Sequence, residues 1–179
     1  MISSIMPKCK NPNCKDKFKP KYFLQKHCME KDECIALEIE MKKATIWKEK
    51  RSEWKEDLKT KGDWIRILQS VFNTFIRTRD KNLPCISCGK TKVEEFHAGH
   101  YIASTYQYHR FNEDNVHKQC SQCNTHLRGN LIPYRIELIK KIGLQRVEYL
   151  ENTRHMMLEL TIEDIKELIK EYKFKTKQL

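Results

Sequence analysis

The sequence predicts a helix-rich α+β protein that contains two zinc-binding modules. Its eight cysteines fall into two groups of four, and four is the number of ligands that closes a structural zinc site. Much of the remaining chain has the apolar spacing of amphipathic helices. Strand-forming residues are concentrated between the two halves of the second cysteine group.

The composition is that of a polar globular protein with an anionic partner. Among 179 residues, 35 are Lys or Arg and 24 are Asp or Glu, which gives a net charge of +11. An excess of this size favours nucleic acid as the partner. No stretch approaches the roughly 18 apolar residues of a membrane helix, and MISSIMPKCK lacks the apolar core of a secretory signal. We therefore expect an intracellular protein whose cysteines stay reduced and bind metal.

Residues 1–34 are predicted to form an N-terminal zinc module. Its first two cysteines flank a turn, KFKPKYFLQKHC could form a short hairpin, and its last cysteine falls in the first turn of a helix. A knuckle, a hairpin and a helix start are the parts of a treble-clef-like zinc site. His27 is an alternative to the third cysteine. The predicted ligands are Cys9, Cys14, Cys28 and Cys34.

Helices are predicted on both sides of the central segment. ECIALEIEMKKATIWKEKRSEWKEDLKT lacks Gly and Pro, which predicts one long charged helix over about 33–60. Gly62 breaks this pattern, and an amphipathic helix with Asp63 as its N-cap completes the segment 35–80. Residues 133–179 read as helical scaffold, with Pro133 in a first turn and Thr161 as an N-cap.

CISC and CSQC predict a second structural zinc in the central segment, residues 81–132. Between them lie 31 residues that read as a strand in KVEEFHAGHYIA, a polar loop, and a second strand in NVHKQC. NTHLRGN then begins a helix that ends at Gly129. The order β–loop–β–helix predicts a ββα-metal core. The predicted zinc ligands are Cys85, Cys88, Cys120 and Cys123.

Metal-dependent cleavage of a phosphodiester needs a general base, a divalent cation and a group that orients the base. His100 ends the first strand and is the predicted base, because imidazole titrates near neutral pH. Asn115 begins the second strand opposite His100 and is expected to hold its ring. Asn124 directly follows Cys123 and is expected to bind Mg²⁺ or Mn²⁺ through its side-chain oxygen.

This constellation resembles the HNH superfamily, and its order is similar to that of the phage endonuclease VII branch. The resemblance implies a structural zinc, His100 as the base and Asn124 as a metal ligand. One position departs, because Gly99 stands where an acidic metal ligand is usual. Strand side chains alternate, so His97 shares a face with position 99 and is our tentative replacement ligand. His117 is the second choice, and His126 is less favoured.

Together with the N-terminal cysteines, LPCISCGK, FHAGHY and RFNEDNVHKQCSQCNTHLRGNLIPYRI resemble the NinG/Rap recombination family of lambdoid phages. The similarity covers nearly the whole chain. It implies a structure-specific endonuclease that cleaves branched DNA, such as Holliday junctions and D-loops, in the cytoplasm of the bacterial host. Phage recombination proteins are expected partners, and a homodimer would let two sites cut opposed strands.

The rival hypothesis is a non-catalytic zinc-binding nucleic-acid adaptor, and Gly99 is its best support. Under either hypothesis, basic side chains near the two zinc modules are candidates for contact with phosphates. These candidates are Lys15, Lys17, Lys19, Lys21, Arg110, Lys118 and Arg128.

Overall fold

The computed structural model describes residues 6–179, and the chain divides into two compact units, Met1–Lys59 and Thr60–Leu179. Residues 1–5 belong to the predicted N-terminal module and to the segment without a signal-like core, and they lie outside the described residues. The segment 35–80 is shared between the units. In the described part of the chain, no helix is long and apolar enough to cross a membrane.

The first unit joins a compact cysteine module to the long helix α1, Asp32–Asp57. Gly and Pro are absent from α1, as the sequence indicated, and Cys34 lies in its first turn. The hairpin expected in KFKPKYFLQKHC does not form. The pairing in the described part of this module is a single bridge between Lys8 and Lys17. Pro20 lacks an N–H donor and Leu24 has a left-handed φ of 64°, so this stretch forms turns and bends.

The second unit begins with α2, Lys61–Arg79, which starts at a capping box. The Thr60 hydroxyl accepts from the Asp63 backbone N–H at 3.2 Å, and the Asp63 carboxylate accepts from the Thr60 N–H at 2.9 Å. The sequence prediction of Asp63 as the N-cap is therefore wrong by three residues, and Gly62 lies inside the first turn. A capping box satisfies two N–H groups at once, which favours the earlier start.

A capping box also starts the last helix. In α5, Ile162–Gln178, Thr161 is the N-cap and Asp164 completes the box, as the sequence predicted.

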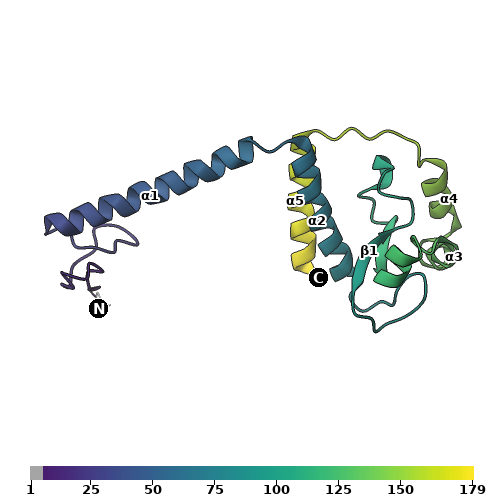
Figure 1. Cartoon of the computed structure of the whole chain (residues 1–179), viewed down its shortest axis with the longest axis horizontal. Coiled ribbons are helices and arrows are strands. Elements are labelled where there is room, and N and C mark those ends of the chain that lie inside the picture. The colour runs from purple at the N-terminus through teal and green to yellow at the C-terminus, as the bar shows by residue number, and fades with distance from the viewer. Residues whose placement is uncertain (1–5) are drawn as a thin grey trace. The chain divides into compact units, whose positions relative to one another are not determined.

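A two-stranded antiparallel sheet crosses the second unit. β1, Phe96–His100, pairs with β2, Val116–Cys120, so that His100 lies opposite Val116. The hairpin contributes Ala98 and Val116 to a core with α2 and α5, which lie side by side in Figure 1. The apolar stripe predicted for α2 is therefore core. The buried members of this core are Trp64, Leu68, Phe72, Phe75, Ile76, Ala98, Val116, Ile165, Ile169 and Tyr172.

A second core joins the end of the hairpin to α3, Leu131–Ile142, and α4, Leu144–Asn152. Its buried members are Ile102, Tyr134, Leu138, Val147 and Leu150. The Tyr134 hydroxyl donates to the Gly99 carbonyl at 2.9 Å, which ties α3 directly to β1. Figure 1 shows the hairpin between the α2–α5 pair and the α3–α4 pair. Helices therefore position β1 and β2 from two sides.

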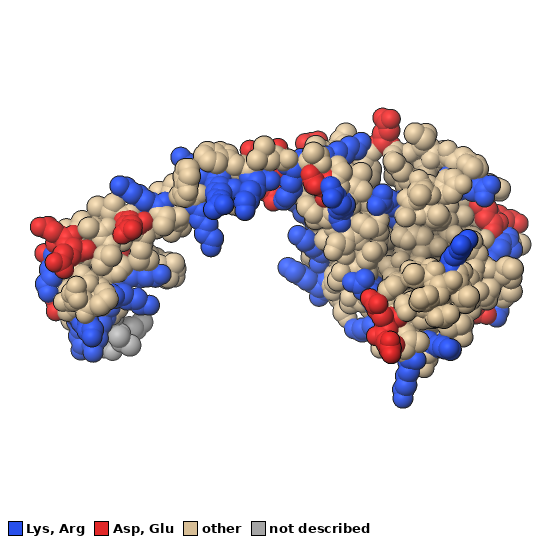
Figure 2. Space-filling model, viewed as in Figure 1, with Lys and Arg blue, Asp and Glu red and all other residues tan. Residues whose placement is uncertain are grey.

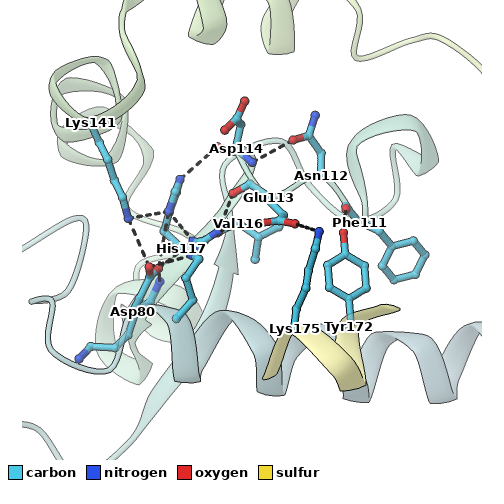
Figure 3. A network of polar contacts seen from close by, with 12 residues as sticks. Asp80, Phe111, Asn112, Glu113, Asp114, Val116, His117, Lys141, Tyr172 and Lys175 are labelled. Carbon is cyan, nitrogen blue, oxygen red and sulfur yellow. Dashed lines mark hydrogen bonds and ion pairs between the residues drawn. The ribbon is translucent and has the colours of Figure 1, made fainter. Parts of the chain in front are cut away.

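A buried polar network connects α2, β2 and α3 (Figure 3). The Asp80 carboxylate, 2% exposed, accepts from Arg79 at 2.9 Å and from the Lys118 backbone N–H at 3.0 Å, and Lys141 Nζ lies 3.5 Å away. Burial alone would raise the pKa of Asp80, but the neighbouring cations Arg79 and Lys141 outweigh burial and hold the pKa far below its usual range.

His117 belongs to this network rather than to a second cation site. Its Nε2 lies 3.1 Å from the Asp114 carbonyl, which can only accept, so Nε2 carries the proton. Its Nδ1 then accepts from Arg79 and Lys141, each at 2.9 Å. Both ring nitrogens are occupied inside the protein. The choice of His117 as a replacement metal ligand is therefore wrong.

We expect Asp80→Asn to lower the free energy of unfolding at pH 7 by about 3–5 kcal/mol, because it leaves the buried cations without their counter-charge. Urea denaturation measures this loss. The control is Glu137→Gln, which removes an exposed pair with Lys140 and should cost less than about 1 kcal/mol.

The stability difference between wild type and Asp80→Asn should also depend on pH. A carboxylate with a lowered folded-state pKa stabilises the fold above its unfolded pKa of about 3.9, and this contribution is lost as the pH falls below that value. The difference between wild type and Asp80→Asn should therefore shrink in acid. Equal stability of the two proteins at pH 7 would contradict the network.

Candidate functional site

Each cysteine quartet converges on a point that suits one metal ion. Within each quartet the four Sγ atoms lie within 4.8 Å of one another. The Cys14–Cys28 and Cys88–Cys120 sulfur pairs are 3.5 and 3.7 Å apart. A tetrahedron with Zn–S bonds of about 2.3 Å has S–S edges of about 3.8 Å. All eight cysteines are free of disulfides, so both quartets could hold zinc, as the sequence predicted.

Amide groups point at several of these sulfurs. In the first quartet, the Asn11 side chain donates to Cys34 Sγ at 3.1 Å. In the second, the Cys120 backbone N–H donates to Cys85 Sγ at 3.3 Å. Such donors favour the thiolate form that binds metal.

The geometry decides between His27 and Cys28 as a ligand. Cys28 Sγ belongs to the quartet, and His27 does not. The His27 Nδ1 lies 2.8 Å from a Glu38 carboxylate oxygen, and both residues are buried. His27 therefore serves the packing of the module against α1.

The second quartet joins the end of β2 to a short π-helical turn, η2, Gln122–His126. Cys120 is the last residue of β2, Cys123 lies within η2, and the Cys123 N–H donates to Cys120 Sγ at 3.4 Å. The helix predicted to begin at Asn124 instead starts two residues earlier and stops at His126, because the cysteine knuckle winds the chain before Asn124. Single π turns are frequent at functional sites.

His100 and Asn124 line one cleft of about 800 Å³. Arg128 and Arg154 also line it, and Glu151 on its wall is held by an ion pair with Arg135. The predicted base from β1 and the predicted cation ligand from η2 are thus brought together, although they are distant in sequence. A second cleft, of about 630 Å³, is lined by the Asp80 network, whose charges are already paired with one another.

The His100 ring is held in one tautomer. Its Nε2 lies 3.0 Å from the Arg110 carbonyl oxygen, which can only accept, so Nε2 carries the proton and Nδ1 keeps a free lone pair. Burial lowers the pKa of His100, and this effect exceeds the rise that the hydrogen bond to Arg110 causes. The ring is therefore neutral at pH 7 and can accept a proton.

Asn115 acts on His100 only indirectly. The expectation that it contacts the ring is wrong, because β2 begins at Val116 and Asn115 turns into the loop. Its fully buried side chain accepts from the Ile102 N–H at 2.6 Å and donates to the Ile102 and His109 carbonyls, each at 2.9 Å. Asn115 thereby fixes the position of His109. The next residue, Arg110, holds the His100 ring through its carbonyl.

Gly99 is glycine because Gln119 occupies the space of a side chain. A Cβ at position 99 would lie 2.2 Å from Gln119 Oε1 and 2.8 Å from Gln119 Cβ. The Gln119 amide is itself fixed, since it donates to Ser87 Oγ and to the Gly129 carbonyl, each at 2.6 Å. An acidic residue cannot stand at position 99 without displacing β2.

His97 lies where the alternation of strand side chains placed it. Its Nδ1 is 3.0 Å from the Asn124 amide nitrogen, and its Nε2 is 3.3 Å from a Glu95 carboxylate oxygen. Sequence reasoning missed Glu95, although residues 95, 97 and 99 share one face by the same alternation. Glu95, His97 and Asn124 form a continuous polar row, and Asn124 at its end lines the cleft.

The candidate phosphate contacts divide into exposed and buried residues. Arg128 is exposed on the cleft wall, and Arg110 is half-buried with its guanidinium on Gln69 at 2.8 Å. The choice of Lys118 is wrong. Both faces of β2 are covered, so Lys118 is 6% exposed, and its ammonium donates to the Lys81 carbonyl at 2.9 Å. The exposed candidates of the first unit are Lys15, Lys17, Lys19 and Lys21.

A family model described as "Bacteriophage Lambda NinG protein" matches residues 3–179. The chain belongs to the NinG family. The match covers both cysteine quartets and the cleft, so these features lie inside the family's domain. The resemblance to NinG is thereby confirmed, while the relation to HNH enzymes stays a prediction.

Individual NinG proteins match along most or all of the chain. Protein ninG of Escherichia phage lambda is 41% identical and that of Salmonella phage P22 is 39% identical, each over 199 aligned positions that span this whole chain and 96% of the relative. Protein ninG of Escherichia phage 933W is 44% identical over 124 positions, 68% of this chain and 61% of that protein. No solved structure matches the chain.

We expect Gly99→Ala to lower the free energy of unfolding by about 1–3 kcal/mol, because the new methyl group overlaps Gln119 in a packed strand pair. Urea denaturation measures the loss. Gly62→Ala is the matched control: its nearest neighbour would be 3.7 Å away in a helical turn, so its stability should stay the same or rise slightly. A Gly99→Ala protein as stable as Gly62→Ala would refute the close contact with Gln119.

Proposed function

We propose that this chain is a divalent-cation-dependent endodeoxyribonuclease that cleaves phosphodiester bonds in branched DNA. The observation that carries the proposal is the shared cleft of His100 and Asn124. His100 supplies a proton acceptor, and Asn124 supplies an oxygen ligand for a cation.

His100 is suited to act as the general base. The Arg110 carbonyl fixes the proton on Nε2, so Nδ1 is the atom that takes a proton from the attacking water. No rotation or proton shift is needed before the reaction. Because its pKa is lowered, the ring stays in the basic form below the pH at which an ordinary histidine is half protonated.

Asn124, which shares the cleft with His100, and its hydrogen-bond partner His97 fit a divalent cation. His97 Nδ1 and the Asn124 amide lie 3.0 Å apart, and a 180° turn of that amide exchanges its nitrogen for its oxygen. Imidazole nitrogen and amide oxygen together suit Mn²⁺ or Mg²⁺. A bound cation would polarise the phosphate and stabilise the departing oxygen. Glu95 would hold His97 by its other nitrogen, as carboxylates commonly do for metal-binding histidines.

Charge supports DNA as the substrate. The chain carries a net charge of +11, and Arg128 and Arg154 line the cleft where they can contact phosphates on either side of the cut. Exposed lysines of the first unit provide a separate basic surface. Two basic surfaces on one chain suit a substrate with several arms. Holliday junctions and D-loops in the host cytoplasm are therefore the proposed substrates, with a homodimer and phage recombination proteins as proposed partners.

The adaptor hypothesis uses the same zinc frame for binding alone. Gly99 favours it, because the usual acidic ligand is absent. The fixed tautomer of His100 and its place in the cleft favour the enzyme, since a binding module needs neither feature.

The test incubates zinc-loaded protein with labelled four-way, flap, linear and single-stranded DNA, with and without Mg²⁺ or Mn²⁺. We expect cation-dependent nicking of branched DNA, with an acid limb below about pH 6.5 because burial lowers the pKa of His100. His100→Ala should reduce the nicking rate at least about 10²-fold, since the proton acceptor is lost.

Zinc content and DNA affinity of His100→Ala should equal those of wild type. His126→Ala is the control. It changes an exposed histidine of η2, the turn that carries Asn124, and should cleave normally. Normal cleavage by His100→Ala would reject His100 as the base. Tight binding of branched DNA by wild type without cleavage in either cation would favour the adaptor.

A further inference from the structure

Two indoles are exposed on the long helix α1. Trp47 and Trp54 are 59% and 53% exposed, and the buried residues of α1 are Cys34 and Glu38 near its other end. Burying a large apolar side chain contributes roughly 2–3 kcal/mol, so the chain by itself gains little of this contribution from either tryptophan. Trp54 follows Trp47 by seven positions, about two helical turns, which places both indoles on one face of the helix.

The two rings contact each other without covering each other. Their centroids are 5.5 Å apart and their planes meet at 86°. In such an edge-to-face pair, the ring that contributes its edge keeps both faces free, and the other ring keeps one. Flat aromatic groups can therefore still stack on this pair.

The charges of α1 are sorted around the same face. At 100° per residue, four cations lie within about 80° of the Trp47 direction, and three acids lie on the opposite side. Within about 80° of the same direction, the acidic residues are Asp32, Glu33 and Glu40 on the N-terminal side of the pair and Asp57 at the C-terminal end of the helix. The four cations are Lys43, Lys50, Arg51 and Lys55, and the three opposite acids are Glu49, Glu53 and Glu56.

The four cations are exposed, and in residues 6–179 none of them forms an ion pair. Figure 2 shows Lys and Arg gathered along this helix. A second copy of α1 is a poor partner for the face, because the cations that flank the tryptophans would meet cations on the other copy. The surface needs a partner that offers flat rings and negative charge together.

We propose that this face of α1 binds unpaired DNA strands, with Trp47 and Trp54 stacking on bases and the four cations contacting phosphates. Stacking of a base on an aromatic side chain is worth roughly 1–3 kcal/mol. Bases in a duplex are already stacked on one another, so this face selects DNA with unpaired bases. Branch points, flaps and displaced strands expose such bases.

This inference rests on the proposed function only in taking DNA as the ligand. Binding is therefore measured without Mg²⁺ or Mn²⁺, so that a failure of stacking can be told from a failure of cleavage. The full zinc-loaded chain is titrated with a 20-nucleotide oligo(dT) and, separately, with a 20-base-pair duplex. Tryptophan fluorescence is the first readout, because the remaining tryptophan, Trp64, is buried in the core of the other unit.

We expect oligo(dT) to quench the fluorescence and the duplex to quench it much less. A Trp47→Ala/Trp54→Ala protein should bind labelled oligo(dT) at least about tenfold more weakly, with duplex affinity changed less than about twofold. Ala is the best helix former, and helix content checked by circular dichroism should be unchanged. Trp→Phe at both positions should retain part of the affinity, because a smaller ring still stacks.

Phe174→Ala is the matched control, since it removes an aromatic side chain that is 64% exposed on α5, a helix of the other unit. Its affinity for oligo(dT) should equal that of wild type. Equal affinities of the double variant and wild type would overturn the proposal. So would a wild-type dimer that the double variant converts to a monomer with unchanged affinity, since the face would then be an interface between copies.

Discussion

Four thiolates that converge on one point are the constraint on which the candidate site depends. Cys85 and Cys88 come from the loop before β1, Cys120 ends β2, and Cys123 lies in the π-helical turn η2. A two-stranded hairpin is marginal by itself in water. A zinc ion held by the four thiolates would join its end to the turn that carries Asn124, so the proposed chemistry would depend on the cysteines although no cysteine takes part in it.

Two neutral histidines of the hairpin, His100 and His117, differ in their hydrogen-bond partners. Burial lowers the pKa of both His100 and His117, so a lowered pKa does not distinguish them. Their partners do. Both nitrogens of His117 are occupied by groups of the Asp80 network, whereas His100 keeps one free nitrogen and lines the cleft. Proton transfer requires that free, accessible lone pair.

Local chemistry was readable from the sequence, and loop geometry was not. Ligand type and spacing were enough to predict both cysteine quartets, and composition, periodicity and a capping residue were enough to predict α1, α2 and α5 respectively. Strand alternation placed His97 beside Asn124 correctly. Asn115 was misassigned because its direction depends on how the loop after His100 folds back. Lys118 was misassigned because alternation implies one solvated face, and both faces of β2 are covered.

The most direct test of a cation site on this zinc frame is anomalous X-ray diffraction from crystals of the zinc-loaded protein grown with Mn²⁺. We predict two zinc ions, one in each cysteine quartet, and one manganese ion bound by His97 and Asn124 beside His100. The opposite result would be two zinc ions with no manganese in the cleft and the Asn124 amide still hydrogen-bonded to His97. That result would contradict a metal-dependent nuclease site at this position.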